Sequence, residues 1–511
     1  MSDQKSIFDR LRSLFGRSKK SEKPVAPQLP VEQSAQTLPR TTGRAGASVP
    51  LIENESPSAE ITGRSKVPKS QTLKSVTPPV AVGPQGGPAP EVDLTLGIDF
   101  GTSCTKVVIG DHGWLGQSYA VPVGIGSNGL ERFLRATQVA AGGNVEANLK
   151  MRLMEKPDSV ELRDLAALYL AGVIRDSLAW FSAEKAGRYK GRTEVWSLNL
   201  GFAAKQINDG PLARAYKEIA NLAAELGPSD HPLSIASVRK LRTAPATDSP
   251  IRIIPANRIA LYPEIAAQLA GYVNSPYRAQ GNLILIDVGA GTLDISTAIL
   301  HGNRDEDIVS FHVCEVKPLG ALKLLEARIS AIEKVSPGSV PNRLEDYQSG
   351  TVPIPESVPE IIGRQHGNQT CIKAFEKASS DFADDAVRLA IACASRFRKL
   401  QRDTHANASF DPWPGQLRFF FTGGGSRLAF YRRLFVQGRF EQELSRYTRW
   451  KETPEDRHRY VQGLRHEPLP APPDLQGLPD ELTSDFDRLS VAHGLAYGCE
   501  NLMKITASVH S

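Results

Sequence analysis

Two stretches of this sequence share one pattern, and the pattern limits the folds that the chain can adopt. Residues 96–107 read LGIDFGTSCTKV, and residues 285–296 read LIDVGAGTLDIS. In each, an apolar run typical of a buried strand ends at an aspartate, a turn rich in Gly and Thr follows, and a second apolar run begins. Two such units, about 190 residues apart, predict a mixed α/β chain with a duplicated lobe and one hairpin in each copy.

The turn residues suit a site for phosphate and a divalent cation. Glycine lets backbone N–H groups approach phosphate oxygens closely, and Thr and Ser hydroxyls add donors. An aspartate at a strand end can hold Mg²⁺ through water, because Mg²⁺ keeps several of its waters. Either hairpin alone is more often an ordinary tight turn. The pair, together with a strand that runs into three glycines over residues 419–427, favours a nucleotide clamped between two lobes.

Five elements occur in an order that resembles the actin/Hsp70/sugar-kinase ATPase superfamily, most closely the Hsp70-type nucleotide-binding domain. Besides the three elements above, residues 261–272 resemble the first interdomain helix of that family, and residues 489–498 resemble the second. Small side chains in both helices suit a close crossing at a hinge: Ala266, Ala267, Ala270, Gly271, Ala492, Gly494 and Ala496. The resemblance covers roughly residues 94–508.

The resemblance implies an actin-like two-lobed ATPase fold with duplicated mixed-sheet subdomains, which binds ATP and Mg²⁺. Lobe I would span residues 94–281 and lobe II residues 282–488. A C-terminal hinge helix over residues 489–508 would return to lobe I.

Individual roles follow from the same resemblance. Asp99 and Asp287 would bind Mg²⁺ through water, and Glu264 would polarise the water that attacks the γ-phosphate. Lys150 matches the lysine that touches the γ-phosphate and would complete the catalytic group, the alternative being a solvated charge on a helix. The residues that would contact phosphate are Gly101, Thr102, Ser103, Gly289, Gly291, Thr292 and Gly320. Those that would border the adenosine are Gly423, Gly424 and Arg427, with Arg398 stacking on the base.

Three departures from the family pattern bear on activity. Ala290 replaces the central glycine of the second turn, which matters only if that position needs a positive φ. The order Pro263–Glu264 reverses the Glu–Pro of the family, so the carboxylate could be displaced by one position. Ala394 and Phe397 stand where the family has an adenine-side Glu and Lys, which weakens the case for adenine selectivity.

The positive charge of the chain is concentrated at its N-terminus. The 511 residues carry a formal charge of +5, which is too small for a general nucleic-acid binder of this length. Residues 1–20 hold six basic and two acidic side chains, hence +4. Residues 4–17 resemble a basic amphipathic helix, which docks on an anionic membrane or in the groove of a protein partner. The alternative is a disordered tail with a chance hydrophobic cluster.

The remaining composition indicates the compartment. Residues 21–93 hold 12 prolines and no aromatic residue, so we expect a disordered linker. Five scattered cysteines without a CxxC pair fit a reducing compartment. No run of 18 apolar residues and no signal-like segment occurs. We therefore expect a cytoplasmic protein, peripheral at the inner membrane face if residues 4–17 bind lipid.

Periodicity and turn signals place further elements along the chain. Helices are expected over residues 160–183, 212–226, 263–273 and 382–400. Strands are expected over residues 195–200, 251–254 and 418–422, and loops or insertions over residues 336–370 and 451–483.

The C-terminal end shapes the functional expectation. Thirteen residues follow Gly498, whereas a folding chaperone of this family continues into a β-rich peptide-binding domain. We therefore expect a slow Mg²⁺-dependent ATPase that acts as a nucleotide-driven switch for a protein partner. The alternatives are an actin-like filament former anchored at the membrane and a scaffold that binds nucleotide without hydrolysis. A sugar kinase is a weaker fourth option, because no motif supplies the aspartate base that it needs.

Overall fold

The computed structural model describes residues 89–124, 129–141, 144–202, 210–244, 253–301, 308–341, 344–347, 353–363, 368–404, 417–448, 464–467 and 469–497. By its contacts the chain divides into Met1–Val80 and Ala81–Ser511, and every described residue belongs to the second unit. The amphipathic segment, nearly all of the expected linker and residues 498–508 of the expected hinge helix lie outside the described residues.

The first sheet is built around the first hairpin. Its strand order is β14-β3-β2-β1-β7-β8, with β4 paired to β2. β1 pairs antiparallel with β2 and parallel with β7, which in turn pairs parallel with β8. The strands are β1 (Glu91–Phe100), β2 (Cys104–Asp111), β3 (Gln117–Ala120), β4 (Arg135–Ala136), β7 (Thr193–Phe202), β8 (Ile259–Pro263) and β14 (Leu475–Gln476). A separate two-stranded ribbon joins β5 (Gln138–Ala141) to β6 (Asn144–Ala147).

The second sheet is built around the second hairpin. Its order is β11-β10-β9-β12-β13. β9 pairs antiparallel with β10 and parallel with β12, which pairs parallel with β13. The strands are β9 (Gly281–Val288), β10 (Leu293–His301), β11 (Ile308–Lys317), β12 (Leu417–Thr422) and β13 (Leu464–Glu467).

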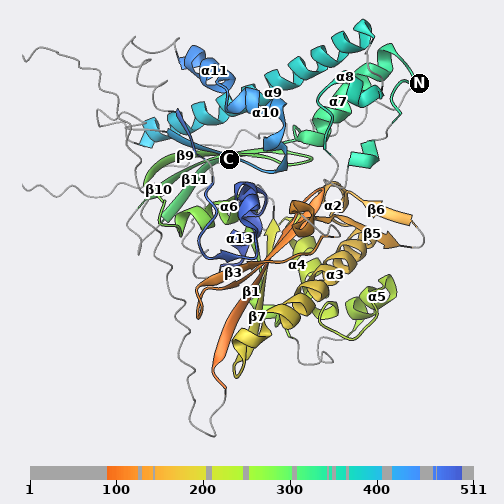
Figure 1. Cartoon of the computed structure of the whole chain (residues 1–511), viewed down its shortest axis with the longest axis vertical. Coiled ribbons are helices and arrows are strands. Elements are labelled where there is room, and N and C mark those ends of the chain that lie inside the picture. Colours follow the sequence, from red (N-terminus) through yellow and green to blue (C-terminus); the bar gives the residue numbers. More distant parts are fainter. Residues whose placement is uncertain are drawn as a thin grey trace, which may run out of the picture. The chain divides into compact units, whose positions relative to one another are not determined.

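The two sheets repeat one topology. In each, three consecutive strands form an antiparallel meander, and the first strand of the meander is flanked by two further parallel strands. The order β3-β2-β1-β7-β8 thus corresponds, strand by strand and direction by direction, to β11-β10-β9-β12-β13. The expectation of a mixed α/β fold with mixed sheets is confirmed (Figure 1).

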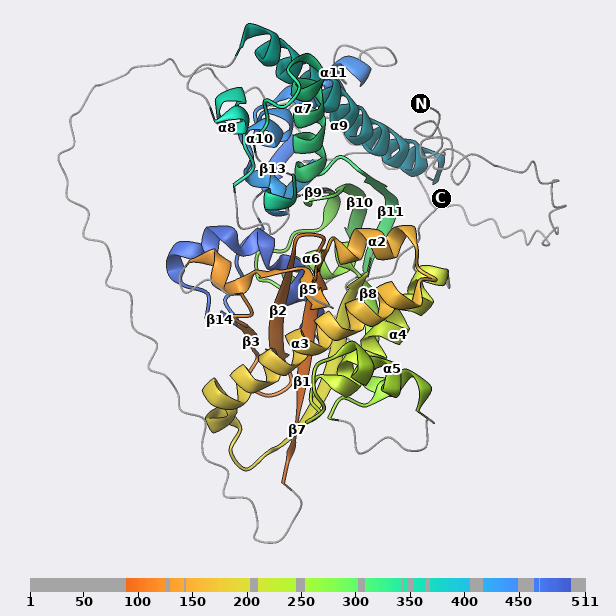
Figure 2. The ribbon, with the colours of Figure 1, turned by 90° about the vertical axis from the view of Figure 1, so that its right-hand side faces the viewer.

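Helices cover the first sheet on the side that Figure 2 presents to the viewer. They are α2 (Leu149–Glu155), α3 (Val160–Glu184), α4 (Pro211–Leu226) and α5 (Ile235–Thr243). Ser159 caps α3, because its side chain accepts a hydrogen bond from the backbone N–H of Leu162. By length and composition alone α3 could cross a membrane, but 67% of its most apolar stretch is buried inside the unit. Its apolar side chains belong to the core beneath β1 and β7.

Along β9 of the second sheet, successive side chains point into two different cores. Ile284 and Ile286 of β9 face helices of this half, whereas Leu283 and Leu285 face α6 (Glu264–Val273). This period of two is what a strand with both faces covered requires. The outer helices are α7 (Ala321–Val335), α8 (Val358–Ile362), α9 (Gln369–Thr404), α10 (Ala429–Phe435) and α11 (Arg439–Thr448).

Two short helices lie between the sheets (Figures 1 and 2). α6 packs on the second sheet, and α13 (Ser490–Leu495) packs on β1 and β2. They cross closely, since a Cβ added to Gly494 would lie 1.6 Å from the carbonyl oxygen of Ala267.

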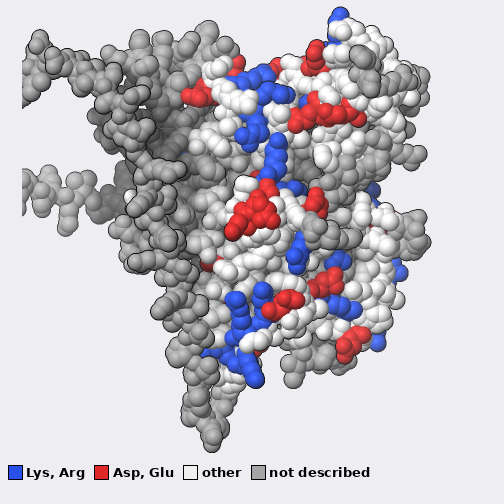
Figure 3. Space-filling model, in the orientation of Figure 1, with Lys and Arg blue, Asp and Glu red and all other residues white. Residues whose placement is uncertain are grey.

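Charged side chains of both signs are interspersed over the face in Figure 3.

Three local expectations were wrong. Ile253 and Ile254 lie in a bend, and the strand of this region is β8, which begins at Ile259. The Pro- and Gly-rich stretch 451–483 contains β13 and β14, whose partners β12 and β3 are distant in sequence. The stretch 336–370 contains α8, which ends at Gly363 in the left-handed conformation.

Candidate functional site

Residues of both hairpins line one cavity, which has a volume of about 520 Å³. Most of the residues predicted from the sequence line it: Asp99, Gly101, Thr102, Ser103, Lys150, Glu264, Asp287, Gly289, Thr292, Gly423, Gly424 and Arg427. They come from β1, α2, α6, β9 and the turns after β1, β9 and β12, elements that are far apart in the sequence.

Two predicted glycines, Gly291 and Gly320, are not among the described residues that line the cavity. The backbone N–H of Gly320 donates to the carbonyl oxygen of Gly291 at 3.3 Å. A Cβ added to Gly320 would lie 2.5 Å from the backbone nitrogen of Thr292, so only glycine fits there without a backbone shift. These two residues therefore shape the second turn rather than line the cavity.

Arg398 is the predicted residue that the fold does not bring to the site. It lies on α9 and is not among the described residues that line the cavity. Its neighbours Ala394 and Phe397 are fully buried in the core against the second sheet. The two positions of α9 that match the adenine-side residues of the family therefore hold side chains that pack in the core.

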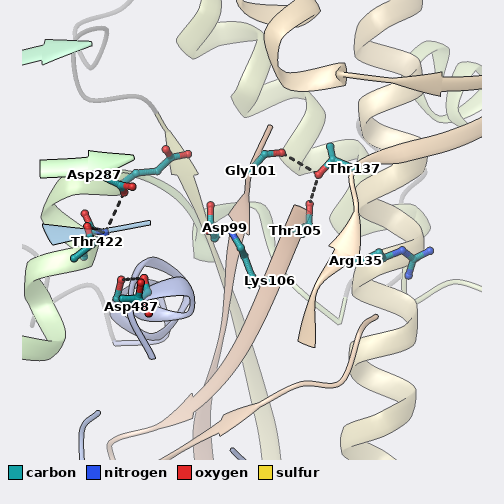
Figure 4. A network of polar contacts seen from close by, with 12 residues as sticks. Asp99, Gly101, Thr105, Lys106, Arg135, Thr137, Asp287, Thr422 and Asp487 are labelled. Carbon is teal, nitrogen blue, oxygen red and sulfur yellow. Dashed lines mark hydrogen bonds and ion pairs between the residues drawn. The ribbon is translucent and has the colours of Figure 1, made fainter. Parts of the chain in front are cut away.

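The first hairpin places an ion pair at the cavity wall (Figure 4). Asp99 and Lys106 are opposite each other in the β1–β2 register, and the Lys106 ammonium lies 2.8 Å from the Asp99 carboxylate. A Cβ added to Gly101 would lie 2.3 Å from the carbonyl oxygen of Cys104, so the tight turn requires glycine. The Thr137 hydroxyl, between β4 and β5, donates to the Gly101 carbonyl at 2.9 Å and stabilises this turn. Sequence reasoning missed Lys106, although counting outward from the turn pairs it with Asp99.

The second hairpin places two carboxylates opposite each other. Asp287 and Asp294 are register partners on β9 and β10. Burial, and after it the charge of Asp99, raises the pKa of Asp287 to about 6. Burial, and after it the charge of Asp287, raises the pKa of Asp294 to about 8. Asp294 was missed from the sequence, and its Oδ1 is buried without a hydrogen-bond partner in the described part of the chain.

Gln268 of α6 orients one of these carboxylates. Its side-chain amide donates to Asp287 Oδ2 at 3.0 Å and to the Thr422 hydroxyl at 2.7 Å. The amide thereby joins the ends of β9 and β12 to the helix between the sheets. The sequence pattern of residues 261–272 indicates no role for Gln268.

Lys150 and Glu264 form a second ion pair at the cavity. The Lys150 ammonium donates to Glu264 Oε1 at 2.6 Å. Burial by itself would lower the pKa of Lys150, but the charges of Glu264, Tyr216 and Asp99 and the hydrogen bond to Glu264 together outweigh it, and the pKa is raised. Pro263 ends β8, and Glu264 is the first residue of α6, so the reversed Pro–Glu order still leaves the carboxylate in the cavity.

Ala290 does not have a positive φ, so its methyl group causes no backbone strain.

The turn after β12 approaches the acidic pair. Gly423 has a φ of 84°, and a Cβ there would lie 2.0 Å from Asp287 Oδ1. Arg427, at the end of the 3₁₀ turn Gly424–Arg427, forms ion pairs with Asp485 and Asp487. The triple glycine therefore lets the backbone pass close to the carboxylates, while Arg427 ties this turn to the segment before α13.

The donors at this site fit a water-held Mg²⁺. Asp99, Asp287 and Asp294 all line the cavity, and oxygen donors are the ligands that Mg²⁺ prefers. Within the described ranges, no three His, Cys, Asp or Glu side chains are grouped so that they could hold a metal ion. An ion here would be held largely through its waters.

No protein-family model matches this chain, and no curated protein matches it significantly. Function is therefore inferred from the motifs and from this geometry.

Proposed function

We propose that this protein binds ATP with Mg²⁺ and hydrolyses it slowly, as a nucleotide-driven switch for a protein partner. The observation that carries the proposal is the meeting of three carboxylates, the Lys150–Glu264 pair and the glycine turns around one cavity. In this proposal the fold is an actin-like, Hsp70-type two-lobed ATPase. The repeated strand topology and the helix pair between the sheets support that assignment.

The residues that line the cavity would have different roles in binding and hydrolysis. Backbone N–H groups of the turns at Gly101 and Gly289 would bind phosphate oxygens, with Thr102 and Thr292 adding hydroxyl donors. Lys150 would hold the Glu264 carboxylate in position to orient the attacking water. Bound Mg²⁺ would neutralise charge on the phosphates. Catalysis of this kind rests on positioning and charge stabilisation, with little acid–base chemistry.

ATP binding and turnover, measured with and without Mg²⁺, test the proposal. We expect binding that requires Mg²⁺, slow release of phosphate, and loss of turnover in Asp287→Asn and Asp99→Ala. Arg258→Gln is the matched control, because Arg258 pairs with Asp93 near the start of β1 and does not line the cavity. Turnover at the wild-type rate in both acidic variants would overturn the assignment of the site. Binding without any turnover would favour the scaffold.

The N-terminal charge supports a docking role for residues 1–20. Their +4 charge would attract this segment to an anionic membrane surface or to a protein partner, which would place a cytoplasmic protein at the inner membrane face. Deleting residues 1–20 should release the protein from anionic vesicles at an unchanged ATPase rate. Equal vesicle binding by the deletion variant would remove the membrane role. A sedimentation assay tests the filament alternative. If the protein pellets with ATP and Mg²⁺, it forms filaments.

A further inference from the structure

Arg488 occupies a position that the motifs do not assign. It is the last residue of the 3₁₀ segment Asp480–Arg488, two residues before α13 begins. Its side chain lines the cavity. It lies against the triple-glycine turn, since a Cβ added to Gly424 would lie 3.5 Å from Arg488 Nε and 3.6 Å from Nη2.

The guanidinium also acts on the first hairpin. Burial raises the pKa of the Cys104 thiol, and the positive charges of Lys106 and Arg488 oppose that rise. Cys104 is the first residue of β2, directly after the turn that holds Gly101 and Thr102. Arg488 therefore lies where its charge reaches both the turn after β12 and the turn after β1.

Arg488 differs from the other basic residues that line the cavity. Lys106 is paired with Asp99, Lys150 with Glu264, and Arg427 with Asp485 and Asp487. Arg488 forms no ion pair within the described ranges, and its buried Nε has no hydrogen-bond partner there. The two aspartates nearest to it in sequence, Asp485 and Asp487, form their ion pairs with Arg427, and their charges only partly oppose the effect of burial on Arg488.

An unpaired cation in this position is costly. Burial lowers the pKa of Arg488, which shows that its charged form is poorly solvated. A buried charge without a partner destabilises a folded protein unless a ligand supplies the opposite charge. A guanidinium presents donors in a planar fork that matches phosphate oxygens.

We propose that Arg488 binds the phosphate chain of the nucleotide and so links the glycine turn after β12 to the β1–β2 hairpin. This inference rests on the proposed function, and it adds a phosphate ligand that comes from the segment leading into α13. Arg427, which lines the same cavity, keeps its aspartate partners and borders the nucleoside.

The test compares three ligands on two variants. Affinities for ATP, ADP and adenosine are measured by calorimetry with Mg²⁺ on the full chain, in Arg488→Gln and in the control Arg258→Gln. We expect Arg488→Gln to weaken ATP and ADP binding by about 10- to 100-fold, the range for hydrogen bonds to a charged group. Adenosine binding should not change, because adenosine has no phosphate. Arg258→Gln should leave all three affinities unchanged.

Each outcome decides one of the two proposals. Absence of ATP binding in the wild type would overturn the proposed function. Wild-type binding with an unchanged ATP affinity in Arg488→Gln would overturn the role of Arg488 alone. Equal weakening of adenosine and ATP would also overturn it, because the arginine would then act on the nucleoside or on the fold.

Stability of the nucleotide-free protein gives an independent readout. Removing a partly buried charge that has no ion-pair partner should leave the melting temperature unchanged or raise it, whereas a guanidinium that held the fold together would lower the melting temperature when removed. If Arg488→Gln does not fold, Arg488→Met decides the matter, because it keeps an apolar stem for packing and removes the charge. An unchanged ATP affinity in Arg488→Met would overturn the inference.

Discussion

The Lys150 ammonium lies 2.6 Å from the Glu264 carboxylate, although 114 residues separate the two in the chain. Lys150 is on α2, which packs with the first sheet, and Glu264 begins α6, which packs on the second. Their side chains are 9% and 19% exposed. The pair thus joins the two halves of the folded unit at the cavity and fixes the direction of the carboxylate.

Replacing Glu264 should separate binding from hydrolysis. Glu264→Gln keeps an oxygen that can accept from Lys150 but removes the charge that orients water. We expect turnover to fall by about 100-fold or more and ATP affinity to change by about 3-fold or less. Single-turnover hydrolysis and equilibrium binding check this. Asp381→Asn, which removes the exposed Lys377–Asp381 pair on α9, is the control and should leave both unchanged. Hydrolysis by Glu264→Gln at the wild-type rate would contradict the role.

Two adjacent glycines provide a matched pair of substitutions. A Cβ on Gly423 would meet Asp287 Oδ1 at 2.0 Å, and the residue has a positive φ, so Gly423→Ala must displace the carboxylate. We expect a loss of about 1–3 kcal/mol in the free energy of unfolding and loss of Mg²⁺-dependent ATP binding. At Gly424 the added methyl group would make an ordinary contact with Arg488, 3.5 Å away. Gly424→Ala should therefore fold at wild-type stability. Equal stability of both variants in a denaturant titration would contradict the geometry.

Local patterns were enough to predict the hairpins and several helices. The strand–Asp–Gly units need only neighbouring residues to form, and Asp99 and Asp287 were placed at strand ends accordingly. The same patterns contained Asp294 and Lys106, which pair across each hairpin with the predicted aspartates. Hairpin register, counted from the turn, would have identified both.

Tertiary packing decided the rest. The sequence does not show which face of α9 meets the core, and Ala394 and Phe397 occupy that face while Arg398 stays outside the cavity. β13 lies in a Pro- and Gly-rich stretch and is a strand because β12 offers it an edge to pair with. Arg488 enters the site only because the segment before α13 returns to the glycine turn. No pattern within about ten residues of these positions carries that information.

The crossing of α6 and α13 should tolerate no added atom at Gly494. A Cβ there would lie 1.6 Å from the Ala267 carbonyl oxygen, which is backbone and cannot move without shifting α6. We expect Gly494→Ala to lower the free energy of unfolding by about 2–4 kcal/mol, since overpacking in a close helix crossing forces backbone shifts. Gly113→Ala is the control, because no atom lies within 4 Å of a Cβ at that position. A denaturant titration in which both variants unfold at the same midpoint would contradict the crossing.

His112 should make the protein lose stability as the pH falls. Its ring stacks on Tyr497, with 4.0 Å between centroids, and burial lowers its pKa from 6.5 to about 4, opposed by Asp474 and reinforced by His493. Between these pH values the unfolded chain binds a proton that the folded chain does not, so the free energy of unfolding decreases on acidification, by up to about 3 kcal/mol. Burial by itself would raise the Asp474 pKa, but the hydrogen bonds from His493 and Ser118 and the charges of His493 and His112 together lower it, and this adds acid sensitivity in the same direction. His112→Phe keeps a ring against Tyr497 and cannot take up the proton, so its stability should fall less between pH 6.5 and pH 4 than that of the wild type. A His112→Phe profile parallel to that of the wild type would contradict the assignment.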